Sequence, residues 1–134
     1  MSEENVEILR QATEAWNSDG IEAMLRFYPE DVIWYPFSDA PIGRDGLKGH
    51  EEIRGLMADW VHGFADFAVA TEELRDLGDR VLWLGVISGT IRGSDVPVRQ
   101  PIGGIAWDFR DGMIGRSRFL PSWEATLGAA GVSR

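Results

Sequence analysis

The sequence contains no cysteine, so it can form no disulfide, thiolate metal site or cysteine nucleophile. This absence is typical of proteins in a reducing cytoplasm, the compartment that we expect. The sequence also lacks an apolar run that approaches the roughly 18 residues of a membrane-spanning helix. Its first residues, MSEENVEI, show no basic segment followed by an apolar one. We therefore expect neither a signal peptide nor a membrane span.

Basic residues are scarce. Lysine and arginine number 13 against 22 acids, which gives a net charge of −9. Such a chain repels phosphate backbones unless its bases cluster, and acids and apolar residues separate the arginines between Arg92 and Arg118. We expect no nucleic-acid partner. Histidine occurs only at His50 and His62, without carboxylates placed to complete a site, so we expect no metal and no cofactor.

A chain of 134 residues is most simply one domain, spanning residues 1–134. Apolar residues at helical spacing predict an amphipathic helix over residues 3–16, and Asp19 with Glu22 is spaced as a capping box for a second helix. The aromatic stretch VIWYPF predicts the first strand. Further helices are predicted over residues 21–28, over 51–64 and from Ser122 onward. Residues 41–49 predict a glycine-rich loop. The remaining strands are predicted over 67–74, 80–92, 96–109 and 113–120.

This order of helices followed by four strands predicts an α+β domain with helices on one face of a curved, mostly antiparallel sheet. Asp111-Gly112 predicts a tight hairpin between the last two strands. Gly85, Gly89, Gly103 and Gly104 fall inside strands, where glycine often marks a bend. A strongly curved sheet with helices on its concave side encloses a cone, and a cone leaves room for a cavity.

Several segments carry a resemblance to a known family: AWNSDGIEAMLRFYPEDVIW, GHEEIRGLMADW, GDRVLWLGVISGTIRGSDVPVRQP, WDFRDGMIGRSRF and EATLGAAG. In this order they resemble the SnoaL-like branch of the nuclear transport factor 2-like superfamily. The resemblance implies a cone-shaped α+β fold. The superfamily contains ketosteroid isomerases, epoxide hydrolases, polyketide cyclases, dehydratases and non-catalytic binders, so the resemblance does not select an activity.

The resemblance implies places for the groups of a ketosteroid isomerase, and this sequence leaves them empty. The general-base aspartate would fall at Tyr35 or Pro36, the oxyanion tyrosine at Ala12 and the protonated aspartic acid at Ile105. Proton abstraction beside a carbonyl needs a base together with an oxyanion stabiliser. We therefore exclude that isomerase chemistry.

The Asp-Arg-Asp set of limonene-type epoxide hydrolases is missing as well. Two of its members would fall near Val86 and Ser88, and the last aspartate would follow Arg118, where Phe119 stands. No recognised catalytic set is left, so the catalytic residues stay unassigned.

The resemblance also implies which side chains face the cone, an apolar and aromatic set with two hydroxyls. These side chains either fill the cone or line a pocket for a flat or branched apolar molecule. The predicted wall comprises Ala12, Trp16, Phe27, Trp34, Leu56, Trp60, Leu82, Leu84, Val86, Ser88, Pro101, Gly103, Ile105, Trp107, Ser117 and Phe119.

Polar candidates lie on and around this wall. Tyr35 either donates a hydrogen bond into the pocket or, by strand alternation, faces away from Trp34. Arg99 shares a face with Pro101 and is expected to point inward near the rim. His50 either orients the loop that enters its helix or presents a polar group at the mouth of the cone.

Three further residues, Asp39, Arg44 and Asp45, lie on a loop over the expected entrance and are most simply solvated.

The other face of the sheet is expected to be apolar too, through Trp83, Gly85, Ile87, Ile102, Gly104 and Ala106. A sheet that is apolar on both faces buries both, which favours a homodimer through the convex face over cover by the chain's own C-terminus.

For function, the sequence favours a binder of a small hydrophobic molecule. The alternatives are an isomerase, cyclase, dehydratase or hydrolase that acts on a terpenoid-, steroid- or polyketide-like substrate through non-standard acid–base residues, and a protein-interaction scaffold.

Overall fold

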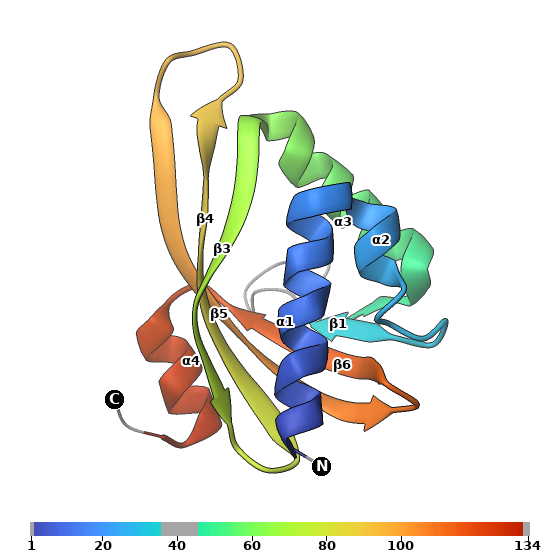
Figure 1. The fold of residues 1–134 in the computed structure, drawn as a ribbon. Helices are drawn as coiled ribbons and strands as arrows, with labels where there is room; N and C mark the ends of the chain where they lie inside the picture. The colour runs from blue at the N-terminus through green and yellow to red at the C-terminus, as the bar shows by residue number, and fades with distance from the viewer. Residues whose placement is uncertain (1, 36–45, 133–134) are drawn as a thin grey trace.

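The computed structural model describes residues 2–35 and 46–132. This part of the chain forms helices and strands in an α+β arrangement (Figure 1). In chain order the elements are α1 (Ser2–Asp19), α2 (Ile21–Leu25), β1 (Ile33–Tyr35), β2 (Leu47–Lys48), α3 (Gly49–Gly63), β3 (Phe64–Asp76), β4 (Arg80–Ile91), β5 (Pro97–Arg110), β6 (Met113–Leu120) and α4 (Trp123–Ala130).

The strands form one open sheet in the order β2-β1-β6-β5-β4-β3. Neighbouring strands are antiparallel except β1 and β6, which run parallel. Helices α1, α2 and α3 lie on one face of the sheet, and α4 packs on the opposite face (Figure 1). The α+β class and the mostly antiparallel curved sheet with helices on its concave face are thereby confirmed.

Two bulges in β3 account for much of the curvature. The pairing of β3 with β4 shifts by one residue between Ala65 and Ala68 and again between Thr71 and Glu73. Asp66, inside the first bulge, has a φ of 59°. An extra residue in one strand bends that strand and increases its twist. The sequence had placed the bend at glycines in the neighbouring strands, so the source of the curvature was only partly predicted.

The predicted capping box is wrong. Gly20, with a φ of 87°, occupies the position before α2, and no side chain caps that helix. Glu22 instead reaches α3, where its Oε2 accepts a hydrogen bond from Arg54 Nε at 2.6 Å. The short strand β2 lies inside the stretch predicted as loop, and β3 begins at Phe64, directly after α3, rather than at Phe67.

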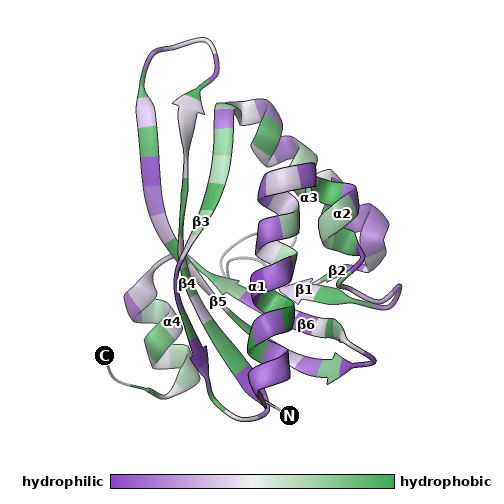
Figure 2. Cartoon of the chain, viewed as in Figure 1, coloured by the Kyte–Doolittle hydropathy of each residue, from purple (hydrophilic) through white to green (hydrophobic). Residues whose placement is uncertain are grey.

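The apolar core has two parts. The larger part lies between the sheet and helices α1 to α3 and includes Leu9, Ala12, Met24, Tyr28, Val32, Trp34, Ile53, Val81, Trp83, Ile87, Ile102 and Ala106. The smaller part lies between the sheet and α4 and consists of Leu82, Leu84, Ile105, Leu127 and Ala130. Figure 2 shows hydrophobic residues gathered along the strands behind α1, whose outer side carries many hydrophilic residues.

The predicted facing of β4 and β5 is wrong. The β5–β6 hairpin turns on Asp111 and Gly112, which both have positive φ, and pairs Arg110 with Met113. This register places Ala106 opposite Ser117. Because opposite residues on neighbouring strands share a face, Ser117 and the odd-numbered residues of β5 cannot both face the helices.

The corrected assignment exchanges the two faces of β4 and β5. Trp83, Ile87, Ile102, Gly104 and Ala106, predicted to be outside, lie on the side of α1 to α3. Residues predicted to be inside share the face that α4 covers in part: Leu82, Leu84, Val86, Ser88, Arg99, Pro101, Gly103, Ile105 and Trp107.

Helix α4 covers part of the sheet face opposite to α1 to α3, which explains why that face is apolar without a second chain. Ser122 caps the helix, as expected from the sequence, and its Oγ accepts a hydrogen bond from Ala125 N at 3.0 Å. Trp123 Nε1 donates to Gly85 O at 2.9 Å, and a Cβ at Gly103 would overlap Thr126. The cover by the chain's own C-terminal segment, the less favoured alternative, is therefore present. None of the helices in the described ranges is long and apolar enough to cross a membrane.

Candidate ligand-binding cavity

A cavity of about 290 Å³ lies between α1, α3 and the concave face of the sheet. All three layers contribute to its wall, together with the turn after α2. The lining residues are Leu9, Thr13, Trp16, Met24, Tyr28, Trp34, Leu56, Met57, Trp60, Phe67, Val69, Trp83, Ile87, Ile102, Gly104, Ile105, Ala106, Ser117 and Phe119. No charged side chain is among these described residues, and seven of them are aromatic.

The aromatic rings of the wall contact one another, most of them edge to face. The ring centroids of Tyr28 and Trp34 are 5.5 Å apart, and those of Trp34 and Phe119 are 4.9 Å apart. At the other side of the wall, Phe67 of β3 lies 6.1 Å from Trp16 and 6.0 Å from Trp60. Such contacts hold large rings in place by more than burial alone. The wall is thus built largely from side chains that support each other.

Seven of the predicted pocket residues lie on this wall: Trp16, Trp34, Leu56, Trp60, Ile105, Ser117 and Phe119. The other predicted residues do not line it: Ala12, Phe27, Tyr35, Leu82, Leu84, Val86, Ser88, Arg99, Pro101, Gly103 and Trp107. The exchanged faces of β4 and β5 explain why most of these residues do not line the cavity, since a shift of one residue moves all the side chains of a strand to the other side of the sheet.

Two of the polar candidates point away from the cavity. Tyr35 stacks on Trp107 with ring centroids 6.0 Å apart, and the Arg118 guanidinium lies 5.0 Å from the centre of the Tyr35 ring. These residues lie on the face opposite to Trp34, as strand alternation indicated. Arg99, expected to point inward, is 68% exposed, and its Nη2 lies 3.6 Å from Glu72 Oε1.

Sequence reasoning missed several wall residues, notably Tyr28, Trp83 and Ile87. Two signals could have found the strand residues. The two-residue Asp111-Gly112 turn fixes the register of β5 against β6, and Ser117 then identifies the inner face of β5. Tyr28 ends the helix predicted over residues 21–28 and was not among the residues predicted to face the cone.

Few polar atoms reach this wall, and one of them is unsatisfied. Trp34 is 4% exposed, and its Nε1 is buried with no hydrogen-bond partner. By contrast, Trp83 Nε1 donates to Thr71 Oγ1 at 2.9 Å, and Thr13 Oγ1 donates to Leu9 O at 3.1 Å. The side-chain hydroxyls of Tyr28 and Ser117, 5% and 3% exposed, make no hydrogen bond within the described part of the chain.

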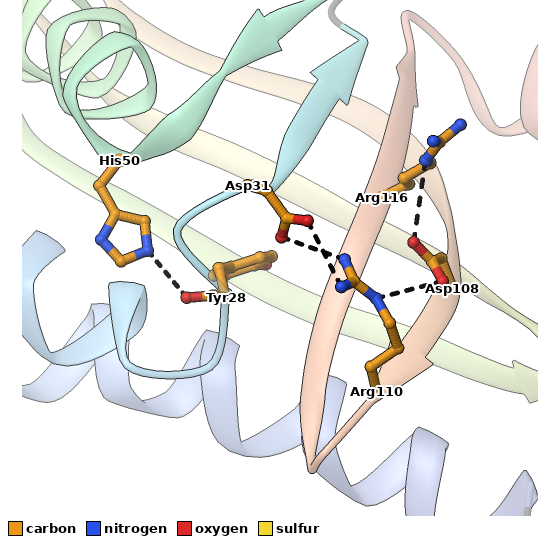
Figure 3. A network of polar contacts seen from close by, with 6 residues as sticks. All are labelled: Tyr28, Asp31, His50, Asp108, Arg110 and Arg116. Atoms are coloured by element: carbon orange, nitrogen blue, oxygen red, sulfur yellow. Dashed lines mark hydrogen bonds and ion pairs between the residues drawn. The ribbon is translucent and has the colours of Figure 1, made fainter.

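His50 acts on the backbone beside the cavity. Its Nε2 lies 2.8 Å from Tyr28 O, which ties the start of α3 to the turn after α2 (Figure 3). This contact bears out the interpretation of His50 as a residue that orients the chain entering its helix. Burial raises the pKa of the Tyr28 hydroxyl above its usual range, so this phenol keeps its proton to a higher pH than an exposed tyrosine does.

A network of ion pairs fixes the hairpin end of the sheet outside the cavity (Figure 3). Arg110 of β5 contacts Asp31 at 3.1 Å and Asp108 at 3.3 Å, and Arg116 lies 3.8 Å from Asp108. The Arg110 guanidinium lowers the pKa of the Asp31 carboxyl. These groups are largely exposed and hold the turn before β1 against the β5–β6 hairpin.

No group of three His, Cys, Asp or Glu side chains in residues 2–35 and 46–132 could hold a metal ion. The loop candidates Asp39, Arg44 and Asp45 lie outside the described residues, as does Pro36.

The family model of the SnoaL-like domain matches residues 9–117. The chain belongs to this family. No curated protein sequence matches the chain significantly. Among solved structures, one similar protein is described as a SnoaL-like polyketide cyclase from Jannaschia sp. CCS1. It is 18% identical, with a TM-score of 0.75, and the match covers 99% of this chain and 95% of that one.

Two other solved structures share the fold of this SnoaL-like domain. A nuclear transport factor 2-like protein of unknown function from Burkholderia pseudomallei K96243 is 17% identical with a TM-score of 0.74, over 93% of this chain and 95% of that one. A protein with a ketosteroid isomerase-like fold from Catenulispora acidiphila DSM 44928, in complex with trimethylamine, is 22% identical with a TM-score of 0.71, over 95% and 94%. At these identities the likeness establishes the fold alone.

Within its described residues this SnoaL-like domain places no carboxylate or imidazole on the cavity wall. Ala12, at the place implied for an oxyanion tyrosine, is 1% exposed and packed in the core. Ile105, at the place implied for a protonated aspartic acid, borders the cavity although it belongs to the core on the α4 side of the sheet, and it is apolar. The geometry therefore offers hydrogen-bond donors and an apolar surface, and no acid–base pair.

Proposed function

We propose that this SnoaL-like domain binds a small, neutral, apolar molecule in the cavity between α1, α3 and the sheet. The observation that carries the proposal is a wall with seven aromatic and no charged residues in the described part of the chain. Ligand pockets are typically concave, mostly apolar and furnished with a few polar groups that orient the ligand. An ion would lose its hydration on entering without gaining an oppositely charged side chain among the described wall residues, so the wall favours neutral molecules.

The cavity volume limits the size of the ligand. A space of about 290 Å³ equals the share of roughly ten water molecules in the liquid. A molecule of about ten non-hydrogen atoms, such as a single substituted ring, fits this estimate. The complex of the Catenulispora acidiphila neighbour with trimethylamine gives one example of a small molecule held by a related fold.

An acid–base enzyme is the second candidate, because one solved neighbour is described as a SnoaL-like polyketide cyclase. Tyr28 is the titratable side chain on the described wall. A phenol whose pKa burial has raised is a weak acid at neutral pH and serves better as a hydrogen-bond donor. Binding is therefore the first proposal, and catalysis on a terpenoid-, steroid- or polyketide-like substrate the second.

We also propose a cytoplasmic location, on the sequence grounds given above, and a homodimer. The apolar strand residues that predicted a dimer from the sequence lie inside the molecule, so the dimer proposal rests on a different part of the surface. The tip of the β4–β5 hairpin projects beyond α4 (Figure 1). Ile91 and Val96 near its tip are 42% and 53% exposed. A second copy could bury this region.

Native mass spectrometry of the purified protein, compared with the denatured protein, tests both proposals. We expect a dimer of the 14.9 kDa chain that carries an additional small mass in the native spectrum, either co-purified or taken up as one acetophenone per chain. Single chains in the native spectrum would contradict the dimer. The bare protein mass with and without added acetophenone would contradict ligand binding.

A further inference from the structure

Three neighbouring residues of the cavity wall carry hydrogen-bond donors. The Tyr28 ring contacts the Trp34 ring edge to face, and Trp34 of β1 stands beside Ser117 in the parallel pairing with β6. All three residues line the cavity and are at least nine-tenths buried. We call Tyr28, Trp34 and Ser117 the donor cluster. It is assembled from the turn after α2 and from two adjacent strands.

Within the described residues, the donor cluster has no protein acceptor. Trp34 Nε1 is buried without a partner, and neither the Tyr28 nor the Ser117 hydroxyl makes a hydrogen bond within residues 2–35 and 46–132. A buried donor without an acceptor is unfavourable and rare in native proteins. Two other polar side chains of the wall, Trp83 and Thr13, do not show this pattern, because both donate to protein oxygens.

The chemistry of the donor cluster limits which ligand atoms it can bind. An indole N–H is a donor only, so its partner must be an acceptor. The surrounding wall holds no cation in its described residues, so an anionic acceptor such as a carboxylate would be buried without charge compensation. A neutral oxygen that accepts hydrogen bonds, as in a ketone, aldehyde, ester or ether, satisfies both conditions.

We propose that the ligand is a neutral, largely apolar molecule with one accepting oxygen, and that this oxygen binds in the donor cluster with Trp34 Nε1 as its donor. The inference rests on the proposed function and adds orientation to it: the oxygen lies against β1 and β6, and the apolar part extends toward Trp16, Trp60 and Phe67. The selected compounds are therefore carbonyl or ether compounds rather than pure hydrocarbons.

Two probes of the same shape test the proposal, acetophenone and α-methylstyrene, in which a methylene group replaces the carbonyl oxygen. The measured quantity is the ratio of their dissociation constants, obtained for the wild type and for Trp34→Phe. Phe keeps an aromatic ring and removes the N–H. We expect Trp34→Phe to lower the preference for acetophenone by about 3- to 10-fold, the effect of one net hydrogen bond, and to leave the binding of α-methylstyrene nearly unchanged.

Trp83→Phe is the matched control. Trp83 also lines the cavity, and the substitution removes the same atoms, but its N–H already donates to Thr71. Trp83→Phe should therefore keep the wild-type ratio of the two dissociation constants, even where it changes the affinity for both probes. Indole resonances in a ¹H–¹⁵N spectrum give a second readout, since the chain has six tryptophans and Trp34→Phe assigns one of them. Acetophenone should move the Trp34 indole proton downfield.

Each outcome decides a separate point. If both probes bind and the preference is the same in the wild type, Trp34→Phe and Trp83→Phe, the donor cluster is not the binding site of the oxygen, while the proposed function stands. If the preference falls equally in both variants, cavity volume and not the Trp34 N–H is responsible, and the inference is wrong. If neither probe binds the wild-type protein, the proposed function fails and the inference fails with it.

Discussion

Tyr28 places a hydroxyl within an apolar wall, just after the end of α2. Its backbone is held by His50, and its ring by Trp34. The side chain is 5% exposed, and burial raises the pKa of its hydroxyl because the phenolate would lose its hydration. The folded protein therefore keeps this proton to a higher pH than the unfolded chain does.

The sign of the resulting pH dependence follows from linkage. Tyr28 contributes stability that is fully present below the pKa of an unfolded tyrosine, about 10, and that declines as the pH rises toward the higher folded value. We predict that the urea midpoint of the wild type falls more between pH 8.5 and 10.5 than that of Tyr28→Phe. An equal fall in both proteins would show that Tyr28 does not carry this dependence.

Trp34 illustrates the limit of sequence reasoning at a single residue. The sequence predicts that it faces the cavity, and the structure places it there. The unpaired state of its Nε1 depends on the distances to every neighbouring acceptor, however, and no pattern of residues contains those distances. Tyr35, the next residue, was predictable in direction from alternation alone, but its stacking on Trp107 was not.

At the scale of elements, the docking of α4 decides the structure of the outer sheet face. Gly103 of β5 lies against Thr126 of α4, a fully buried residue whose Oγ1 also donates to Ser122 O at 2.7 Å. A β-branched side chain held by its own helix cannot move aside easily. The contact therefore requires glycine in the strand.

We predict that Gly103→Ala destabilises the protein by about 1–3 kcal/mol, as overpacking of a tight contact does. Gly128→Ala, on α4 itself, is the control: a Cβ there meets no atom within 4 Å, and alanine favours a helix over glycine by roughly 0.8–1.0 kcal/mol. Urea unfolding of both variants measures the difference. A stable Gly103→Ala protein would mean that α4 does not pack as described.

The faces of β4 and β5 show why element-level prediction failed where it did. Both faces of these strands are apolar, because α1 to α3 cover Trp83 and Ile87 while α4 covers Leu82 and Leu84. Hydrophobicity alone cannot orient such a strand. The helices, the strand order and the hairpin turn were predictable, since each depends on local periodicity or on the Asp111-Gly112 pair.

The whole molecule combines a family fold with a cavity wall whose described residues include no carboxylate and no imidazole. Overall class and family followed from the sequence, because they depend on the order of elements over most of the chain. The identity of the wall did not follow completely, because it depends on sheet register and on side chains contributed by segments far apart, such as Leu9 and Phe119. The central claim is that this wall encloses the binding site.

Calorimetric titration with acetophenone, on a variant with a filled cavity, tests this claim most directly. Thr13 of α1 lines the cavity and bonds only within its own helix, so Thr13→Trp places a large ring in the space. Gln11→Trp, at an exposed site on the same helix, is the control. We predict one-to-one binding to the wild type and to Gln11→Trp, and its loss in a folded Thr13→Trp protein. Unchanged binding in Thr13→Trp would contradict the account.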